Sequence, residues 1–84
     1  MKSIRFTIHA QDKLRLMQRQ RFDVNEAKVI SAVETPEQVM PGYEGRFIAQ
    51  INLNGEHVLR VVYEETEEIT VVTLYPGMRE RYEG

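Results

Sequence analysis

The chain of 84 residues contains no cysteine and no tryptophan. Without cysteine it can form neither a disulfide nor a thiolate metal site, so packing must hold the fold together. The absence of cysteine is also compatible with a reducing compartment. We therefore predict a cytoplasmic location.

Long hydrophobic runs are also missing. No apolar stretch approaches the roughly 18 residues that a membrane span needs, and residues 1–5 are polar and basic with no hydrophobic stretch after them. We expect neither a membrane helix nor a secretory signal peptide. Because the composition does not shift along the chain and no Ser/Gly-rich linker interrupts it, we predict a single domain over residues 1–84.

The chain has no overall excess of positive charge, since its formal net charge is -2. A basic RNA-binding module is usually positive. The distribution is uneven, however. Residues 1–33 hold seven basic and three acidic side chains (+4), whereas residues 34–84 hold four basic and ten acidic ones (-6). This asymmetry allows a local basic face, and the alternative is ordinary solvated charge on helix surfaces.

The first third of the chain predicts one strand and two helices. Alternation over residues 4–8 predicts a strand, and Ala10, Leu14 and Met17 recur at helical spacing within a helix over residues 9–19. Asp23 to Glu26 forms a capping box, with Phe22 placed to pack on Ala27, which predicts a second helix over residues 24–34. The buried stripe expected for that helix is Ala27, Ile30 and Val33.

The remainder predicts strands. Residues 38–40 form a short edge strand before Pro41, and residues 46–53, 57–65 and 68–75 form longer ones. Asn54-Gly55 marks a hairpin. A three-residue loop with Gly55 as a bulge keeps odd positions of both strands on one face, and we favour it over a two-residue turn.

The element order predicts an α+β fold: a strand, two helices, then a three- or four-stranded antiparallel sheet with the helices packed on one face. The other sheet face is left open. Arg46, Gln50 and Arg60 are expected to lie on it, beside aliphatic side chains.

Motifs for cofactor chemistry are absent as well. The sequence has no Gly-rich phosphate loop, no nucleophile elbow and no paired-histidine metal motif. His9 and His57 fall on separate elements with no obvious third ligand. We predict no metal and no cofactor.

Several short motifs resemble the RelE/ParE toxin superfamily. They are the opening Phe6-Thr7-Ile8-His9-Ala10, the helix that carries Arg15, and the strands with Arg60-Val61-Val62-Tyr63 and Val71-Val72-Thr73-Leu74-Tyr75-Pro76. The resemblance covers nearly the whole chain. Its nearest branch is an uncharacterised bacterial domain family close to the BrnT-like toxins, whose common ending is similar to Glu80-Arg81-Tyr82-Glu83.

This resemblance implies a RelE/ParE-like fold and a toxin-type ribonuclease of a toxin-antitoxin system, which cleaves RNA by metal-independent general acid/base catalysis. Its expected partners are RNA, with ribosome-associated mRNA among the candidates, and a cognate antitoxin protein. No membrane partner is expected, and the free chain is expected to be a monomer or a homodimer.

The chemistry assigns roles to particular residues. RNA cleavage through the 2′-hydroxyl needs a proton acceptor, positive charge beside the phosphorane and a donor for the leaving oxygen. We predict His9, Arg60 and Tyr75 as the catalytic residues, because an imidazole titrates near neutrality and a guanidinium pairs two phosphate oxygens. Arg15, Arg46, Arg81 and Tyr82 are the residues predicted to bind the substrate.

Each assignment has a structural alternative. His9 could cap the first helix, Arg60 could pair with Glu44 or Glu64, and Tyr63 continues the apolar face of its strand and belongs to the core. For the whole chain, the alternatives are a non-catalytic interaction or inhibitor module that docks through the open face or an edge strand, and an inactive orphan toxin homologue.

Overall fold

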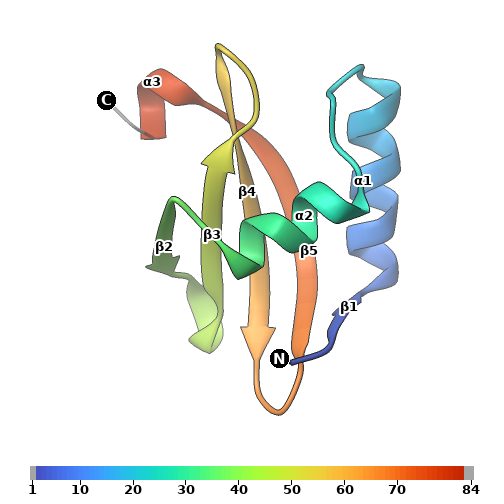
Figure 1. Cartoon of the computed structure of the whole chain (residues 1–84), viewed down its shortest axis with the longest axis vertical. Coiled ribbons are helices and arrows are strands. Elements are labelled where there is room, and N and C mark those ends of the chain that lie inside the picture. The colour runs from blue at the N-terminus through green and yellow to red at the C-terminus, as the bar shows by residue number, and fades with distance from the viewer. Residues whose placement is uncertain (1, 83–84) are drawn as a thin grey trace.

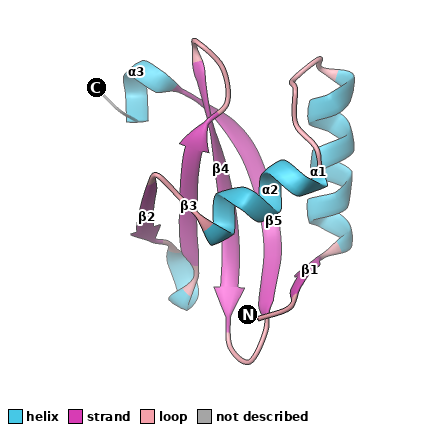
Figure 2. Ribbon diagram, in the orientation of Figure 1, coloured by secondary structure: helices cyan, strands magenta, loops and turns pink. Residues whose placement is uncertain are grey.

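The computed structural model describes residues 2–82 and has the predicted α+β fold, with a mixed five-stranded sheet (Figures 1 and 2). The strand order is β1-β5-β4-β3-β2. The strands are β1 (Ile4–Phe6), β2 (Gln38–Pro41), β3 (Phe47–Asn52), β4 (His57–Glu65) and β5 (Ile69–Met78). The helices are α1 (Ile8–Arg19), α2 (Glu26–Glu34), the short α3 (Arg79–Tyr82) and a 3-10 turn, η1 (Tyr43–Gly45).

Strands β2 to β5 form the four-stranded antiparallel sheet that the sequence predicts. The first strand joins this sheet as well, pairing in parallel with β5 through Ile4 to Phe6. The sheet is therefore mixed. Parallel pairing is possible because the connection from β1 to β5 is long: it contains both helices and strands β2 to β4.

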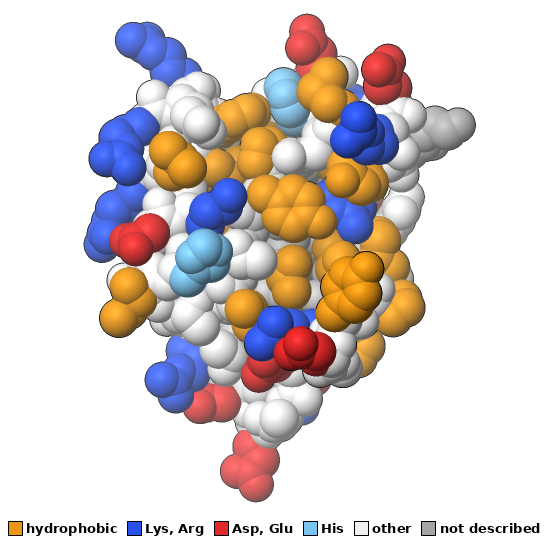
Figure 3. Space-filling model, turned by 180° about the vertical axis from the view of Figure 1, so that it is seen from behind, with side chains coloured by type: hydrophobic (Ala, Val, Ile, Leu, Met, Phe, Trp, Pro, Cys, Tyr) orange, Lys and Arg blue, Asp and Glu red, His pale blue; other side chains and the backbone are white. Residues whose placement is uncertain are grey.

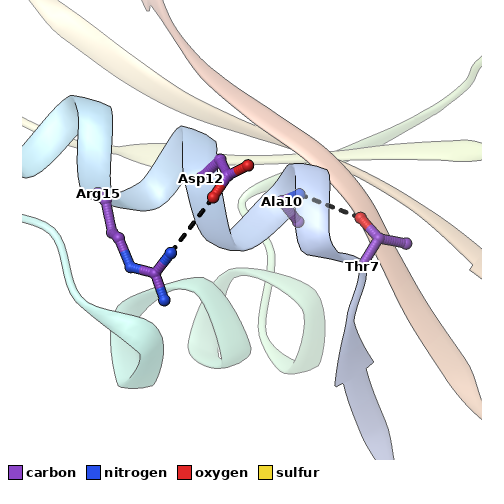
Figure 4. Close-up of polar contacts among 4 residues, drawn as sticks. All are labelled: Thr7, Ala10, Asp12 and Arg15. Atoms are coloured by element: carbon purple, nitrogen blue, oxygen red, sulfur yellow. Dashed lines mark hydrogen bonds and ion pairs between the residues drawn. The ribbon is translucent and has the colours of Figure 1, made fainter.

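The junction between β1 and α1 is set by Thr7 (Figure 4). Its backbone N–H donates to Val71 O at 3.0 Å, while its hydroxyl oxygen accepts from the Ala10 N–H at 3.0 Å. Because Thr7 caps the helix, the strand ends at Phe6 and not at Ile8 as predicted, and α1 starts at Ile8, one residue early. Ala10, Leu14 and Met17 are buried, as the periodicity predicts.

The start of α2 differs from the prediction. Asn25, not Asp23, is the N-cap, and its side chain accepts from the Lys28 N–H at 2.9 Å, so the helix begins at Glu26. Val29, Ala32 and Val33 are buried, and Ala27 is exposed. The capping box was therefore wrong, because Asn25 and not Asp23 caps the helix. Of the expected stripe, Val33 is buried as predicted, Ile30 is half-buried and Ala27 is exposed.

The β3–β4 hairpin keeps odd positions opposite odd positions, as predicted: Ala49 pairs with Val61 and Ile51 with Leu59. Its loop contains residues 54–56, closed by the Leu53 N–H donating to His57 O at 3.1 Å. Gly55 does not have a positive φ, so the loop is not closed by the glycine bulge that the sequence predicts. Asn54 closes it instead, by accepting from the N–H groups of Glu56 and His57.

Strand β5 runs three residues beyond its predicted end at Tyr75, through Pro76 and Gly77. Proline is tolerated there because β1 pairs with β5 only at residues 69–71, which leaves the second half of β5 as a sheet edge. The prediction ended the strand at Tyr75 and assigned Pro76 and the residues after it to a polar tail. After Met78 the chain turns into α3 (Figure 1).

The two long helices and one face of the sheet enclose the core. In Figure 1, α2 crosses in front of the central strands and α1 lies beside β5. The buried apolar residues are Ala10, Leu14, Met17, Val24, Val29, Ala32, Val33, Ala49, Leu53, Leu59, Val61, Tyr63, Val71 and Leu74. Helix packing on one face is thus confirmed. The opposite face carries the polar groups described next.

Candidate functional site

Three polar side chains form a row across the sheet on the face opposite the core. In the register of the sheet, Gln50 of β3 lies beside Arg60 of β4, which in turn lies beside Tyr75 of β5. Cross-strand partners project to the same side of a sheet, and the neighbouring pair Ala49–Val61 projects into the core. The row therefore projects away from the two long helices.

Arg60 is the centre of this row, and each of its nitrogens has a hydrogen-bond partner. Its Nε donates to the Tyr75 hydroxyl oxygen at 3.1 Å, and its Nη1 donates to Gln50 Oε1 at 2.5 Å. Its Nη2 donates to the sulfur of Met40, a weak acceptor, at 3.3 Å. The guanidinium is thus held in one orientation from three strands.

Tyr82 of α3 covers the guanidinium. The Arg60 Cζ lies 4.1 Å from the centre of the Tyr82 ring, against 5.8 Å for the Tyr75 ring, so Tyr82 makes the closer cation–π contact. Gly77 permits this arrangement, since a Cβ placed there would lie only 2.6 Å from Cδ2 of the Tyr82 ring. Helix α3 therefore places its Tyr82 ring over Arg60, the centre of the row.

The centre of the site is a buried positive charge that has no counter-ion among the described residues. Arg60 is 5% exposed and Gln50 is 2% exposed. Within residues 2–82, no carboxylate lies within 4.0 Å of the Arg60 nitrogens. A hydrogen bond from a charged group to a neutral acceptor contributes about 1.5–3 kcal/mol, which offsets the desolvation of the cation without cancelling its charge.

The structure also shows where the other predicted arginines lie. Arg46, just before β3, donates from Nε to Glu64 Oε1 at 2.8 Å. Glu64 is thus the partner of Arg46 and not of Arg60, so the predicted alternative for Arg60 is wrong for this glutamate. Arg15 of α1 pairs with Asp12 at 3.2 Å on an exposed helix surface (Figure 4). Such exposed pairs contribute about 0–1 kcal/mol.

The remaining predicted site residues lie apart from Arg60 or at its margin. His9 is in the first turn of α1, is exposed, and makes no hydrogen bond or ion pair among the residues that the structure describes. Arg81 is exposed on α3. The structure therefore brings Arg60, Tyr75 and Tyr82 together, and none of the partners described for Arg60 is His9, Arg15, Arg46 or Arg81.

Tyr63 lies on the core side of the sheet, as its strand alternation predicts. Burial raises the pKa of its phenol above the usual value of 10.0, and the negative charge of Glu65 adds to this shift. It therefore stays protonated well above neutral pH. Tyr63 is a packing residue, in contact with the Phe47 ring at 5.7 Å between ring centres.

The sequence did not identify every residue of the row. Gln50 was placed on the open face but had no role, and Met40 and Gly77 had none either. The hairpin register could have indicated Gln50, because the favoured loop parity allows residues 50 and 60 to be opposite one another. Nothing local indicates Met40 or Gly77, because their contacts with Arg60 and Tyr82 depend on elements far apart in the sequence.

The surface around the row is uneven in charge (Figure 3). Hydrophobic side chains extend across the middle of this face, and Lys and Arg side chains gather along one side. Helix α1 lies on that side of the molecule. In the part of the chain that the structure describes, no three His, Asp or Glu side chains come together to hold a metal ion. No helix within residues 2–82 is long and apolar enough to cross a membrane.

Comparison with known proteins bears on the fold. No protein-family model matches the sequence, and no curated protein is similar to it. Among solved structures, a chain in the crystal structure of the E. coli DinJ-YafQ toxin-antitoxin complex has a similar fold, with a TM-score of 0.59. The sequences are 15% identical, and the match covers 99% of this chain and 98% of that chain. At this identity, the likeness shows that the two chains share their fold over essentially their whole lengths.

Proposed function

We propose that this chain is the toxin of a toxin-antitoxin pair and that it acts on RNA as a metal-independent endoribonuclease. The observation that carries the proposal is Arg60, a buried guanidinium held by three neutral acceptors, with no carboxylate beside it among residues 2–82. A cation kept in this state is a ready partner for a phosphate. The similar fold of a chain in a toxin-antitoxin complex supports the biological role.

In this proposal, the row supplies two of the three groups that the reaction needs. The RNA 2′-oxygen attacks phosphorus, the bond to the 5′-oxygen breaks, and a 2′,3′-cyclic phosphate forms. Arg60 stabilises the negative charge that develops on the phosphoryl oxygens. Tyr75 accepts from Arg60 Nε through a lone pair and retains its own hydrogen, which it can give to the leaving 5′-oxygen.

The phosphate reaches Arg60 when the Tyr82 ring moves from its seat over the guanidinium. With Arg60 only 5% exposed, the covered state has no room for a phosphate. A displaced Tyr82 can stack on a base next to the scissile bond, since aromatic rings bind unpaired RNA bases in this way. Arg46, Arg81 and Arg15 then serve as outer contacts for the RNA backbone.

His9 is the proton acceptor that the sequence predicts for the 2′-hydroxyl, and this role requires the bound RNA to bring that hydroxyl to His9 while Arg60 holds the adjacent phosphate. It is exposed and unpartnered within residues 2–82, so it is accessible to solvent and to RNA. This assignment rests on imidazole chemistry and not on a contact with Arg60. His9→Ala tests it separately: loss of cleavage with retained RNA binding supports the role, and full cleavage excludes it.

The partner proposed for the toxin is an antitoxin protein. Strand β2 is an edge of the sheet, with Val39 48% exposed, and Tyr43 in the turn after it is 90% exposed. An exposed edge offers unpaired backbone groups to an added strand of a partner. The same edge favours the second candidate function, a non-catalytic interaction module.

Expression and RNA cleavage test the proposal. Expression of the wild-type chain should arrest growth, and the purified protein should cleave single-stranded RNA in the presence of EDTA. Arg60→Gln should lower the cleavage rate by about a hundredfold or more, as expected when a group that stabilises the transition-state charge is lost. Arg19→Gln, at an exposed arginine of α1, is the matched control and should cleave normally.

The salt dependence of RNA binding separates the two candidate functions. If about four phosphates are contacted, affinity for single-stranded RNA should fall roughly 50-fold between about 50 and 200 mM salt. Normal growth on strong expression, intact RNA and no salt-dependent RNA binding would exclude the nuclease. Capture of a protein partner with little salt dependence would then favour the interaction module.

A further inference from the structure

Gln50 is the most deeply buried polar side chain of the row, at 2% exposed. It lies directly opposite Arg60 in the register of β3 and β4. Its Oε1 accepts from Arg60 Nη1 at 2.5 Å, the shortest of the three hydrogen bonds of that guanidinium. A side chain this buried and this close sets the orientation of the arginine.

The chemistry of this contact is unusual for a buried arginine. Such a group normally pairs with a carboxylate, because an isolated charge is costly to bury. Glutamate has the same length as glutamine and would offer the same acceptor atom. Gln50 therefore supplies the hydrogen bond that orients Arg60 and omits the negative charge that would neutralise it.

Within residues 2–82, the other groups around Arg60 also bring no negative charge to it. Tyr75 and Met40 are neutral acceptors, and Glu64, four residues further along β4, is held 2.8 Å from Arg46 Nε. Each Nη of a guanidinium carries two hydrogens. Within residues 2–82, one acceptor is present for each Nη, which leaves one hydrogen on each of them for an incoming anion.

We propose that Gln50 is a positioning residue that fixes Arg60 through a neutral amide and so reserves its positive charge for a phosphate of the RNA substrate. The inference rests on the proposed function, and it adds a requirement that the proposed function alone does not make. The acceptor at position 50 must be uncharged. In this inference Gln50 acts through its hydrogen bond to Arg60 and not through a contact of its own with the substrate.

The decisive variant is Gln50→Glu, which changes an amide to a carboxylate at nearly constant shape. The probe is a short, fluorescein-labelled single-stranded RNA with 2′-O-methylated riboses, which cannot be cleaved, and binding is measured by fluorescence anisotropy across salt concentrations. Gln50→Glu should weaken binding roughly tenfold and reduce the slope of log affinity against log salt by about 0.7, the share of one phosphate. Arg60→Gln should produce the same two changes.

Two controls separate charge from shape. Asn52→Asp places a carboxylate two residues further along β3, on the same face, and should leave the slope unchanged. Gln50→Met removes the acceptor without adding charge, so it should weaken binding less than Gln50→Glu and keep the wild-type slope. A melting curve for each variant verifies that the chain is folded, and Gln50→Met keeps the inference testable if Gln50→Glu does not fold.

The outcomes distinguish this inference from the proposed function. If Arg60→Gln binds RNA like the wild type, the phosphate site at Arg60 is wrong, and the inference falls with it. If Arg60→Gln weakens binding while Gln50→Glu keeps wild-type affinity and slope, the phosphate site stands and the role of Gln50 is wrong. A reduced slope in Gln50→Met would also overturn the inference, because it would mean that the amide itself serves in RNA binding.

Discussion

At the scale of single residues, Arg60 combines two properties that rarely occur together. It is as buried as a core residue, and its charge is not compensated by a carboxylate within residues 2–82. Three neutral hydrogen bonds and one aromatic ring make this state tolerable. The ring contributes about 0.5–2 kcal/mol, so the cover is weak enough to be displaced by a phosphate.

Tyr63 allows a pH prediction, because burial raises its pKa in the folded chain. The unfolded state loses the phenolic proton first as pH rises, so the native state then holds more protons than the unfolded state. Stability from this group is therefore complete below about pH 10 and falls as pH rises above it. Urea unfolding at about pH 9 and pH 10.5 should show a larger loss of stability for the wild type than for Tyr63→Phe. Equal losses in the two proteins would contradict the prediction.

At the scale of elements, Thr7 joins α1 to the sheet. Its hydroxyl caps the helix through the Ala10 N–H and donates to Val72 O at 2.9 Å, at the irregularity where β5 shifts its register against β4. Thr7→Val should lower the free energy of unfolding by about 1–2 kcal/mol, because both the cap and the bond to Val72 are lost. Urea denaturation measures this. Thr7→Ser keeps the hydroxyl and should be close to wild type, whereas a stable Thr7→Val would show that the cap is unimportant.

The contact between α3 and β5 gives a second prediction at this scale. Gly77→Ala introduces a Cβ into the space of the Tyr82 ring and should displace it from Arg60. Modification of Arg60 by phenylglyoxal, followed by peptide mass spectrometry, should then speed up about tenfold, as expected when an uncovered state populated at about one-tenth becomes the main one. The exposed Arg19 in the same sample is the internal reference.

Gly55→Ala is the matched control for Gly77→Ala. No atom lies within 4 Å of a Cβ placed at Gly55, so this change should leave the reactivity of Arg60 as it is. Tyr82→Ala should reproduce the effect of Gly77→Ala. If Arg60 reacts at the wild-type rate in both Gly77→Ala and Tyr82→Ala, the ring does not control access.

The elements also show what the sequence can predict. Alternation in β3 and β4 placed Gln50 and Arg60 on the face away from the helices, because their period of two is intrinsic to a strand. The start of α2 was misjudged because Asp23 and Asn25 are both good caps, and the sequence alone does not distinguish them; in the structure Asn25 is the cap. The position of the Tyr82 ring next to Gly77 and over Arg60 could not be predicted. It depends on a reversal of the chain after β5, which no local sequence pattern indicates.

At the scale of the whole molecule, the two faces of the sheet have different tasks. One face packs against α1 and α2 and stabilises the chain, and the other carries the row of Gln50, Arg60 and Tyr75 among apolar and charged side chains (Figures 1 and 3). The net charge of -2 conceals this division. In the proposed function, RNA is bound on the open face, where Arg60 contacts a phosphate.

The central claim is that Arg60 binds a phosphate of RNA. The most direct measurement is a nitrogen-15 NMR titration that follows the Arg60 Nε–Hε resonance, assigned with Arg60→Gln, as the non-cleavable RNA is added. The account predicts a saturable shift of this resonance at the same RNA concentrations that saturate binding. An Arg60 resonance that stays in place at saturation, while the arginines of α1 shift, would contradict the account.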